Sequence, residues 1–578
     1  MSIKTPENDR YSNAAEYDSN GSDVYDLYAS LLNYKRAINN INRIAVKLDW
    51  VPLDHRRRLK AYELLNSYFS NYSRSFRKNP ETGDTALNED LCEVGDSFWL
   101  CEKMRDKLLG GGITLNTELS SLGDKIAYEK LLQSTLLADD IKSLIQEQLN
   151  ILSAAEEISL LREKILGGWF KNNNIFNTIH ENELTASWSG DCVYYIYWDV
   201  NKECPNIKTY DPGFVFPFYF YDSPEESLMD GDKEIVERWF LAYDTKFGDY
   251  DAVYRETYEL VIELDGYKCY KHAAFYKTNS ISIEEFSDVN IFSDGLIDDW
   301  VDLQIDFIPF QWVSNLKIGS SNFGLSNIQN NVDILDNLIN NYSDISTNSE
   351  YLGGAIIGAS GKEVRPVKNS STNELIPIRI MPRSVYFLGE GGSMDLIDTS
   401  NMQSALLSTE DSLFKRFLNN NNIPDILSSK GGDATRDLSG YALRIRMTPF
   451  IDKMVPLRTS RQEIYSAMME KVMKMFSIYG NAFEKKIFSG ALFKINFKFG
   501  DLYPQDEADN ISILNSKTQL FSKKTVLKMA REAGYDIDID NELDLLNSDA
   551  DNDVSRSQSL FDTRLNTEEK LKDNTDEV

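Results

Sequence analysis

The sequence contains few of the residues on which several kinds of protein site depend. Its 578 residues include only three histidines and five cysteines, and no two cysteines have CxxC spacing. A histidine-rich metal site and a disulfide framework are therefore not expected, and the cysteines are interpreted as reduced thiols. No run of 18 apolar residues occurs, and the N-terminus lacks the basic-then-apolar pattern of a signal peptide. We therefore expect no membrane span and no secretion.

The motifs of common catalytic and nucleotide sites are also missing. The stretch GGAIIGASGKE (353–363) resembles a phosphate-binding loop, but Ile356 replaces its first glycine and Glu363 replaces the Ser or Thr that would hold magnesium. The acidic segments 536–542 and 549–553 lack the Gly and Glu of a calcium loop. No GxSxG or HExxH motif occurs. We therefore expect no enzyme activity, no cofactor and no metal site.

Basic residues are the scarcer charge, and their distribution is uneven. The chain has 61 Lys and Arg against 91 Asp and Glu, which gives a net charge of -30 and argues against nonspecific wrapping of DNA. However, eleven bases oppose six acids in 412–474, and five bases oppose two acids in 361–383. These clusters favour contact with a polyanion at one local place. The alternative is that they are ordinary surface cations paired with acidic neighbours.

The chain is predicted to combine helices and strands. Apolar residues recur at helical spacing from 24 to 76 and from 127 to 166, which predicts helices in both regions. Aromatic and β-branched segments divided by Gly, Pro and Asp then predict a β-rich layer. The expected strands lie at 186–200, 213–221, 236–243 and 254–264. The first 322 residues are therefore interpreted as one mixed α/β body, of which residues 1–24 form a mobile arm.

Two helices around a small insert are predicted next. Apolar residues advance in steps of three and four after the capping-type run 320–322, which predicts a helix with a narrow seam against a neighbouring helix. These residues are Leu325, Ile328, Val332, Leu335, Ile339 and Tyr342. Short β-like pieces follow in 353–399, and a second helix is expected at about 401–420. The pattern indicates an antiparallel pair that carries a β-rich tip.

The remaining chain is predicted to contain a Gly-rich loop, a long helix and a small helical module. The loop lies in DILSSKGGDATRDLSGYALRIRM (425–447), and the helix extends to Tyr479, with a kink or break expected at Pro449 and Pro456. The segment LFKINFKF (492–499) alternates as a half-buried strand does. Ser522 and Gly534 are expected to cap a short helix, followed by an acidic helix at 540–546. The acidic tail 548–578 is expected to be disordered.

This order of elements resembles the portal proteins of tailed bacteriophages over about residues 25–547. The similar segments are SGDCVYYIYWD, DFIPFQWVSN, GLSNIQNNVDILDNLINNYSDIST and ILSSKGGDATRDLSG. The resemblance implies an α+β portal-type fold with an α/β wing, a two-helix stem, a small β-rich clip, a long kinked helix and a helical crown. The implied divisions are a flexible arm (1–24), wing (25–322), first stem helix (323–349), clip (350–400), second stem helix (401–421), tunnel loop (422–440), wing (441–500), crown (501–547) and tail (548–578).

The resemblance also implies a function and a set of partners. It implies a homo-oligomeric ring, usually of twelve subunits, at one capsid vertex of the virion, assembled in the host cytoplasm. Double-stranded DNA would be packaged and ejected through its channel. The implied partners are the major capsid protein, the terminase large subunit and a head-tail adaptor protein, the last two docking on the clip.

The resemblance assigns three groups of candidate residues. Bases on a flexible loop would touch passing DNA weakly, while an otherwise acidic channel would prevent sticking. The candidate channel residues are Lys430, Arg436, Arg444 and Arg446; the clip docking residues are Lys362, Arg365, Lys368 and Arg379; the stem packing residues are Leu325, Ile328, Val332, Leu335 and Ile339.

Two other classes of protein remain as alternatives at this point. Another structural virion protein, such as a head-tail adaptor or a baseplate component, would share the acidity and the β-rich layers. It would not need paired helices around an insert followed by a Gly-rich loop. An enzyme such as a packaging nuclease-ATPase or a nucleotidyltransferase is the third interpretation, and the absence of a Walker motif argues against it.

Overall fold

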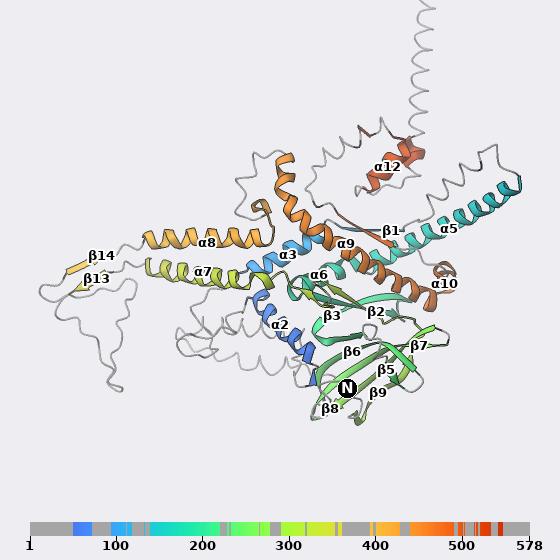
Figure 1. Cartoon of the computed structure of the whole chain (residues 1–578), viewed down its shortest axis with the longest axis horizontal. Coiled ribbons are helices and arrows are strands. Elements are labelled where there is room, and N and C mark those ends of the chain that lie inside the picture. Colours follow the sequence, from blue (N-terminus) through green and yellow to red (C-terminus); the bar gives the residue numbers. More distant parts are fainter. Residues whose placement is uncertain are drawn as a thin grey trace, which may run out of the picture. The chain divides into compact units, whose positions relative to one another are not determined.

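A computed structural model (Figure 1) divides the chain into two units, residues 1–499 and 500–578. The main described ranges of the first unit are 50–51, 53–71, 94–110, 112–117, 139–219, 228–230, 233–264, 266–277, 291–317, 321–352, 357–360, 393–396, 400–427, 440–489 and 495–499. In the second unit the main described ranges are 521–532 and 542–546. The predicted arm (1–24), the helix expected before Trp50, most of the 353–399 insert, Gly534 and the tail 548–578 lie outside the described residues.

A six-stranded antiparallel sheet forms one part of the first unit. Its strands are β4 (Val215–Tyr219), β5 (Leu228–Asp230), β6 (Lys233–Phe247), β7 (Tyr250–Glu263), β8 (Gly266–Lys277) and β9 (Ile291–Asp302). Neighbours follow the order β4-β6-β7-β8-β9, with β5 also paired to β6. Strands adjacent in sequence are thus paired in space, and three of the aromatic segments predicted as strands overlap β4, β6 and β7.

The inner strands of this sheet pack on both faces because side chains alternate along each strand, whereas the edge strand β9 is largely exposed. On β6, Phe240 and Ala242 face a cluster that includes Trp50 from the chain segment before α2 (Leu53–Phe69). Trp239 and Leu241 face the opposite way, into the main core. The sheet is therefore a middle layer with apolar packing on either side.

Two small sheets and several helices complete the main core. The strands are β10 (Phe310–Ser314), β2 (Asp191–Asp199) and β3 (Cys204–Tyr210) in one sheet, and β1 (Ile113–Thr117) with β15 (Ile495–Phe499) in the other. The helices are α3 (Asp96–Leu109), α5 (Asp139–Asn172), α6 (Ile175–Ser189), α9 (Gly440–Tyr479) and α10 (Ala482–Phe488). The strand expected at 186–200 begins only at Asp191, because α6 continues to Ser189 and Gly190 ends it with a positive φ of 96°.

The long helix α9 continues through both Pro449 and Pro456, so of the two outcomes expected at these prolines the break is excluded and the kink stays a prediction. Both prolines are exposed, and they are seven residues apart, so they lie on the same face of the helix. A proline removes one N–H donor and leaves a carbonyl four residues earlier without its usual partner. Water can satisfy such a carbonyl on an exposed face, which explains why the helix is not broken.

A helix pair extends from this body (Figure 1). It consists of α7 (Val332–Leu352) and α8 (Ser400–Asn420), and a short antiparallel ladder of β13 (Ile357–Ser360) and β14 (Ser393–Leu396) connects residues beyond their ends. Before α7 come β11 (Leu316–Lys317), β12 (Gly324–Leu325) and a 3-10 turn. The described parts thus contain the helices expected around a β-rich insert.

The second unit contains a short helix that agrees with the predicted cap. Helix α12 (Lys523–Glu532) begins directly after Ser522, whose carbonyl oxygen accepts a hydrogen bond from the Val526 N–H at 3.0 Å. Residues 542–546 form a further helical turn. The acidic helix predicted at 540–546 coincides with that turn over its described length.

Candidate functional site: the α7–α8 pair and its base

Four side-chain contacts fix the register of the α7–α8 pair. Asn331 Nδ2 donates to Asn421 Oδ1 at 3.1 Å at the base, and the Tyr342 hydroxyl donates to Glu410 Oε1 at 2.8 Å. Asn341 Nδ2 donates to the carbonyl oxygen of Leu406 at 3.0 Å, and Gln403 Nε2 donates to Ser349 Oγ at 3.2 Å. Residue numbers rise along α7 as they fall along α8, so the helices are antiparallel.

The apolar side chains of α7 are buried only near the base of the pair. Leu335 and Ile339, two of the predicted stem packing residues, are buried, while Val332 is the first residue of α7 and is half-buried. On α8 the buried aromatic residue is Phe417, and Phe414 next to it contacts Trp99 of α3 with ring centroids 6.3 Å apart. The pair is therefore joined to the body through its base.

The prediction that Leu325 and Ile328 belong to the same helix is wrong. Leu325 lies in β12, and Ile328 precedes the 3-10 turn η5 (Gln329–Asn331), although its side chain is fully buried. The reason is a close backbone approach at Gly324, where an added Cβ would collide with the carbonyl oxygen of Gly190. The Gly324 N–H also donates to Asp191 Oδ1 at 2.8 Å. The chain is thus held against α6 and β2 and becomes helical only later.

A lysine of α9 joins the base of the pair to the long helix. Lys453 Nζ donates to the carbonyl oxygen of Asn421 at 3.3 Å, directly beyond the last residue of α8. A cation at a helix C-terminus is favoured by the helix dipole. Burial lowers the pKa of Lys453 to about 8. The Asn421 side chain also donates to the Phe417 carbonyl oxygen at 2.8 Å, so this asparagine connects the turn η5 before α7 with α8 and α9.

An arginine of α9 is fully buried and paired. Arg461 Nε donates to Glu183 Oε1 of α6 at 2.7 Å, and its Nη1 donates to the Ser314 carbonyl oxygen at 2.7 Å. The Tyr465 hydroxyl donates to the same carboxylate. Burial is the largest single influence and would lower the pKa of Arg461, but the charge and hydrogen bond of Glu183 together with Tyr465 and Cys192 outweigh it and raise the pKa. Arg461 is therefore a structural cation and cannot meet a ligand in solution.

Two further bases of α9 also bind main-chain carbonyls. Arg458 Nε donates to Leu108 and Nη2 to Lys107, both at 2.9 Å, at the end of α3. Lys471 Nζ donates to the Phe310 carbonyl oxygen of β10 at 2.6 Å, and burial lowers the pKa of Lys471 to about 8. Much of the basic excess seen in 412–474 is therefore used inside the protein.

The predicted channel and clip residues are mostly outside the described ranges. Lys430 and Arg436 belong to 428–439, and the four clip candidates belong to 361–392, neither of which is described. Arg444 lies in the first turns of α9, and Arg446 is exposed there. Lys415 and Arg416 on α8, which were counted in the basic cluster but not proposed as a site, are also exposed. Their role could not be derived from the sequence because it depends on which helix face is free.

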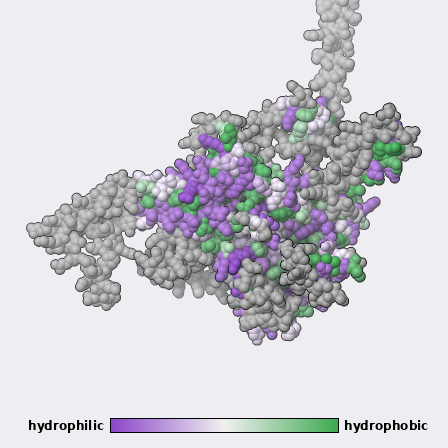
Figure 2. Space-filling model, viewed as in Figure 1, coloured by the Kyte–Doolittle hydropathy of each residue, from purple (hydrophilic) through white to green (hydrophobic). Residues whose placement is uncertain are grey.

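Helix α5 exposes an unusually apolar surface. Leu144 is 62% exposed and Ile151 is 55% exposed, and Ile158 continues the same seven-residue spacing along one face. Figure 2 shows hydrophobic colour on part of this helix, in contrast with the mostly hydrophilic α7–α8 pair. Clustered exposed apolar side chains are typical of protein–protein contact surfaces.

The described residues offer no site for a metal ion and no membrane helix. No group of three His, Cys, Asp or Glu side chains among them could hold a metal ion. Within the same ranges, no helix is long and apolar enough to cross a bilayer.

A family model described as "Phage portal protein, SPP1 Gp6-like" matches residues 144–538. The matched region contains the strands from β2 to β15, the α7–α8 pair and the long helix α9, and it covers more than half of the chain. The chain therefore belongs to the phage portal protein family, and the resemblance derived from the order of its elements is confirmed. The match favours a portal over the adaptor, baseplate and enzyme alternatives.

The other comparisons add little to this assignment. No curated protein matches the chain. A similar solved structure is described as "Neck of native GTA particle computed with C12 symmetry", with 11% sequence identity. The likeness covers 83% of this chain and 94% of that chain, with a TM-score of 0.33.

Proposed function

We propose that the chain is the subunit of a closed homo-oligomeric ring that forms the DNA channel at one capsid vertex. In this role it packages and ejects double-stranded DNA, and it binds the major capsid protein, the terminase large subunit and a head-tail adaptor. The observation that carries the proposal is the family match over residues 144–538. The protein is proposed to act by shape and charge, without a catalytic step.

Two structural features support an oligomer. The exposed aliphatic side chains of α5 are suited to burial against another protein surface. The α7–α8 pair has a packed base but a polar outer surface for most of its length (Figure 2). A heterologous contact between such subunits closes into a ring when the rotation between neighbours permits it.

The channel proposal places Lys430 and Arg436 on the loop that faces passing DNA. The whole chain has a net charge of -30, so an acidic lumen would repel phosphate, and a few cations would add weak contacts. Arg446, exposed at the start of α9, would extend this basic path. Such contacts weaken as salt rises, because binding releases counterions from the DNA and this release is less favourable at a high salt concentration.

Native mass spectrometry with negative-stain imaging tests the ring. A closed particle of about twelve copies with an axial hole is expected. A protein that stays monomeric or dimeric over the whole accessible concentration range, with and without capsid scaffold protein, would contradict the proposal.

The loop is tested by Lys430→Ala with Arg436→Ala in assembled particles. We expect ring mass to be unchanged while DNA packaging or retention falls. Lys485→Ala with Lys486→Ala is the matched control, because these adjacent lysines are exposed on α10. Normal packaging and retention by the loop variant would remove the loop from the mechanism.

A further inference from the structure

The outer side of α7 is acidic. The helix carries four acids, Asp333, Asp336, Asp344 and Glu350, and no lysine or arginine. Asp333, Asn337, Asn340, Asp344 and Thr347 are all exposed, and they advance in steps of four and three, so they form one stripe. We call these five residues the α7 edge. Within the described chain, neither Asp333 nor Asp344 is paired with a base within 4.0 Å.

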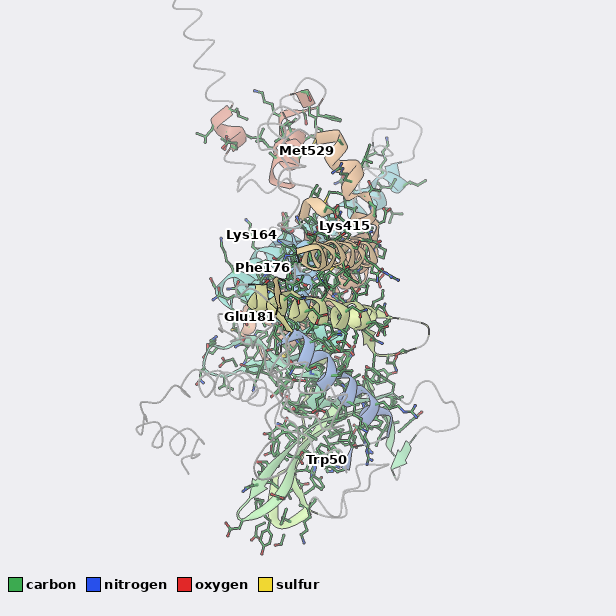
Figure 3. All side chains as sticks on the ribbon, turned by 90° about the vertical axis from the view of Figure 1, so that its left-hand side faces the viewer. Trp50, Lys164, Phe176, Glu181, Lys415 and Met529 are labelled. Atoms are coloured by element: carbon green, nitrogen blue, oxygen red, sulfur yellow. The ribbon has the colours of Figure 1, made fainter. Side chains whose placement is uncertain are left out.

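The outer side of α8 is basic near the base of the pair. Lys415 and Arg416 are the only two bases of this helix, and both are exposed. Figure 3, which labels Lys415, shows α8 and α7 side by side. Neither base forms an ion pair with an acid of the described residues. We call these two residues the α8 edge.

The two edges lie on opposite sides of the helix pair. Contacts between the helices use Asn341 and Tyr342 of α7, whereas the α7 edge follows the other side of that helix. On α8, Glu410 faces α7, and both residues of the α8 edge lie at least about a third of a turn away from it around the helix. The edges therefore cannot meet within one chain without separating the pair.

The register places one acid of the α7 edge, Asp333, near the height of Arg416, whereas Asp344 lies seven residues beyond the level of Lys415, about 10.5 Å along the axis. From Asn331 to Tyr342 the chain advances eleven residues along α7, while its partner moves back eleven residues, from Asn421 to Glu410. Arg416 is therefore level with Asp336, three residues from Asp333. At a rise of about 1.5 Å per residue, this offset is about 4.5 Å along the axis.

We propose that the α7 edge of one copy binds the α8 edge of a second copy. A second copy suits each edge because the two edges carry opposite charges and lie on opposite sides of one helix pair. Such a contact is head-to-tail and repeats around a ring. The inference rests on the proposed function, because it names the surface through which the ring closes.

The chemistry of this contact makes it weak and sensitive to salt. Exposed ion pairs contribute little individually and are screened within about 8 Å at physiological ionic strength. Asn337 and Asn340 add polar groups and no apolar area, so the stem contact can form and separate with little hydrophobic cost. We expect rings to dissociate more readily as salt rises, whereas a purely apolar contact would be strengthened by salting-out ions.

Two charge-reversal variants of the full-length protein test the contact. The first carries Lys415→Glu and Arg416→Glu, and the second carries Asp333→Lys and Asp344→Lys. Each places like charges on both edges, so each alone should require at least about tenfold more subunit for half of the protein to form rings. Mixed in equal amounts, the variants restore opposite charges at every contact if they alternate. Native mass spectrometry should then show rings that contain both variants in equal number.

The controls separate this inference from the proposed function. Lys485→Glu with Lys486→Glu, on exposed positions of α10, should assemble as the unchanged protein does. If the unchanged protein forms rings and each reversal variant alone forms them equally well, the edge contact is refuted and the ring stands. If both reversal variants fail and their mixture also fails, the contact is refuted as well. If the unchanged protein forms no ring, the proposed function fails with it.

A role of the α8 edge in binding DNA would give a different result. The first variant would then assemble normally but lose DNA retention, and mixing with the second variant would not restore it. That outcome would overturn the contact between copies.

Discussion

Replacement of Arg461 by methionine should destabilise the first unit strongly. The guanidinium is 0% exposed and the Glu183 side chain is 1% exposed, so Arg461→Met leaves a buried carboxylate that, among the described residues, keeps the hydrogen bond from the Tyr465 hydroxyl. Removing one member of a buried ion pair costs about 3–5 kcal/mol because the other charge stays uncompensated. The carbonyl oxygen of Ser314 also loses its 2.7 Å donor.

The assay compares this variant with the loss of a more exposed ion pair, which a different residue of α9 forms with the segment between β9 and β10. Lys474 and Asp306 are 2.9 Å apart, but their side chains are 29% and 50% exposed, so Lys474→Met should cost at most about 1 kcal/mol. Because a chain of this size need not unfold in one step, the unfolding midpoint in urea is compared between variants without a single global free energy. Cleavage by a protease under native conditions gives an independent measure of opening.

A double variant identifies the cause of the loss. Glu183→Leu with Arg461→Met removes both charges, and replacement of a buried ion pair by apolar residues is often close to neutral. The double variant should therefore be more stable than Arg461→Met alone. If Arg461→Met shifts the midpoint no more than Lys474→Met, the reasoning about the buried pair is refuted.

Three further substitutions have defined outcomes. Burial lowers the pKa of Lys471 from an ordinary 10.5 to about 8, so between these two pH values the unfolded chain binds more protons than the folded one, and stability should rise with pH. Lys471→Met should remove this contribution, seen as a smaller increase in the urea unfolding midpoint between pH 7.5 and pH 9.5. Gly324→Ala should cost about 1–3 kcal/mol by forcing the chain from Gly190, seen as faster proteolysis before α7. Lys453→Met should cost about 1 kcal/mol by leaving the Asn421 carbonyl without this donor, measured by urea unfolding.

The periodicity of apolar residues in the sequence predicted the existence of the helix pair correctly, but it did not predict the residue at which α7 begins. Leu335 and Ile339 repeat at helical spacing and are buried in α7 as expected. Leu325 and Ile328 continue the same spacing but lie before the helix. Their position is decided by the approach of Gly324 to Gly190, which is separated from it by more than a hundred residues. No local pattern contains that information.

The partners of the buried charges also could not be predicted from a single sequence. Arg461 and Glu183 are 278 residues apart, and nothing near either residue marks it as buried. The effect of the two prolines of α9 was also open from the sequence. Pro449 and Pro456 allowed either a kink or a break, and α9 is not broken because both lie on its exposed face, where solvent can satisfy the carbonyls that lose their donors.

The local excess of bases in an acidic chain therefore has a structural cause. Lys453, Arg458, Arg461 and Lys471 each donate to main-chain carbonyls at the ends or edges of other elements, which otherwise would be left without donors as α9 packs against them. These four cations hold α8, α3 and β10 around one helix. Their removal should change stability and leave any contact with phosphate unaltered, because they are engaged inside the body. The bases left for a polyanion or a second copy are those on free surfaces, which is why the tests of assembly and of DNA contact are directed at α8 and the loop before α9.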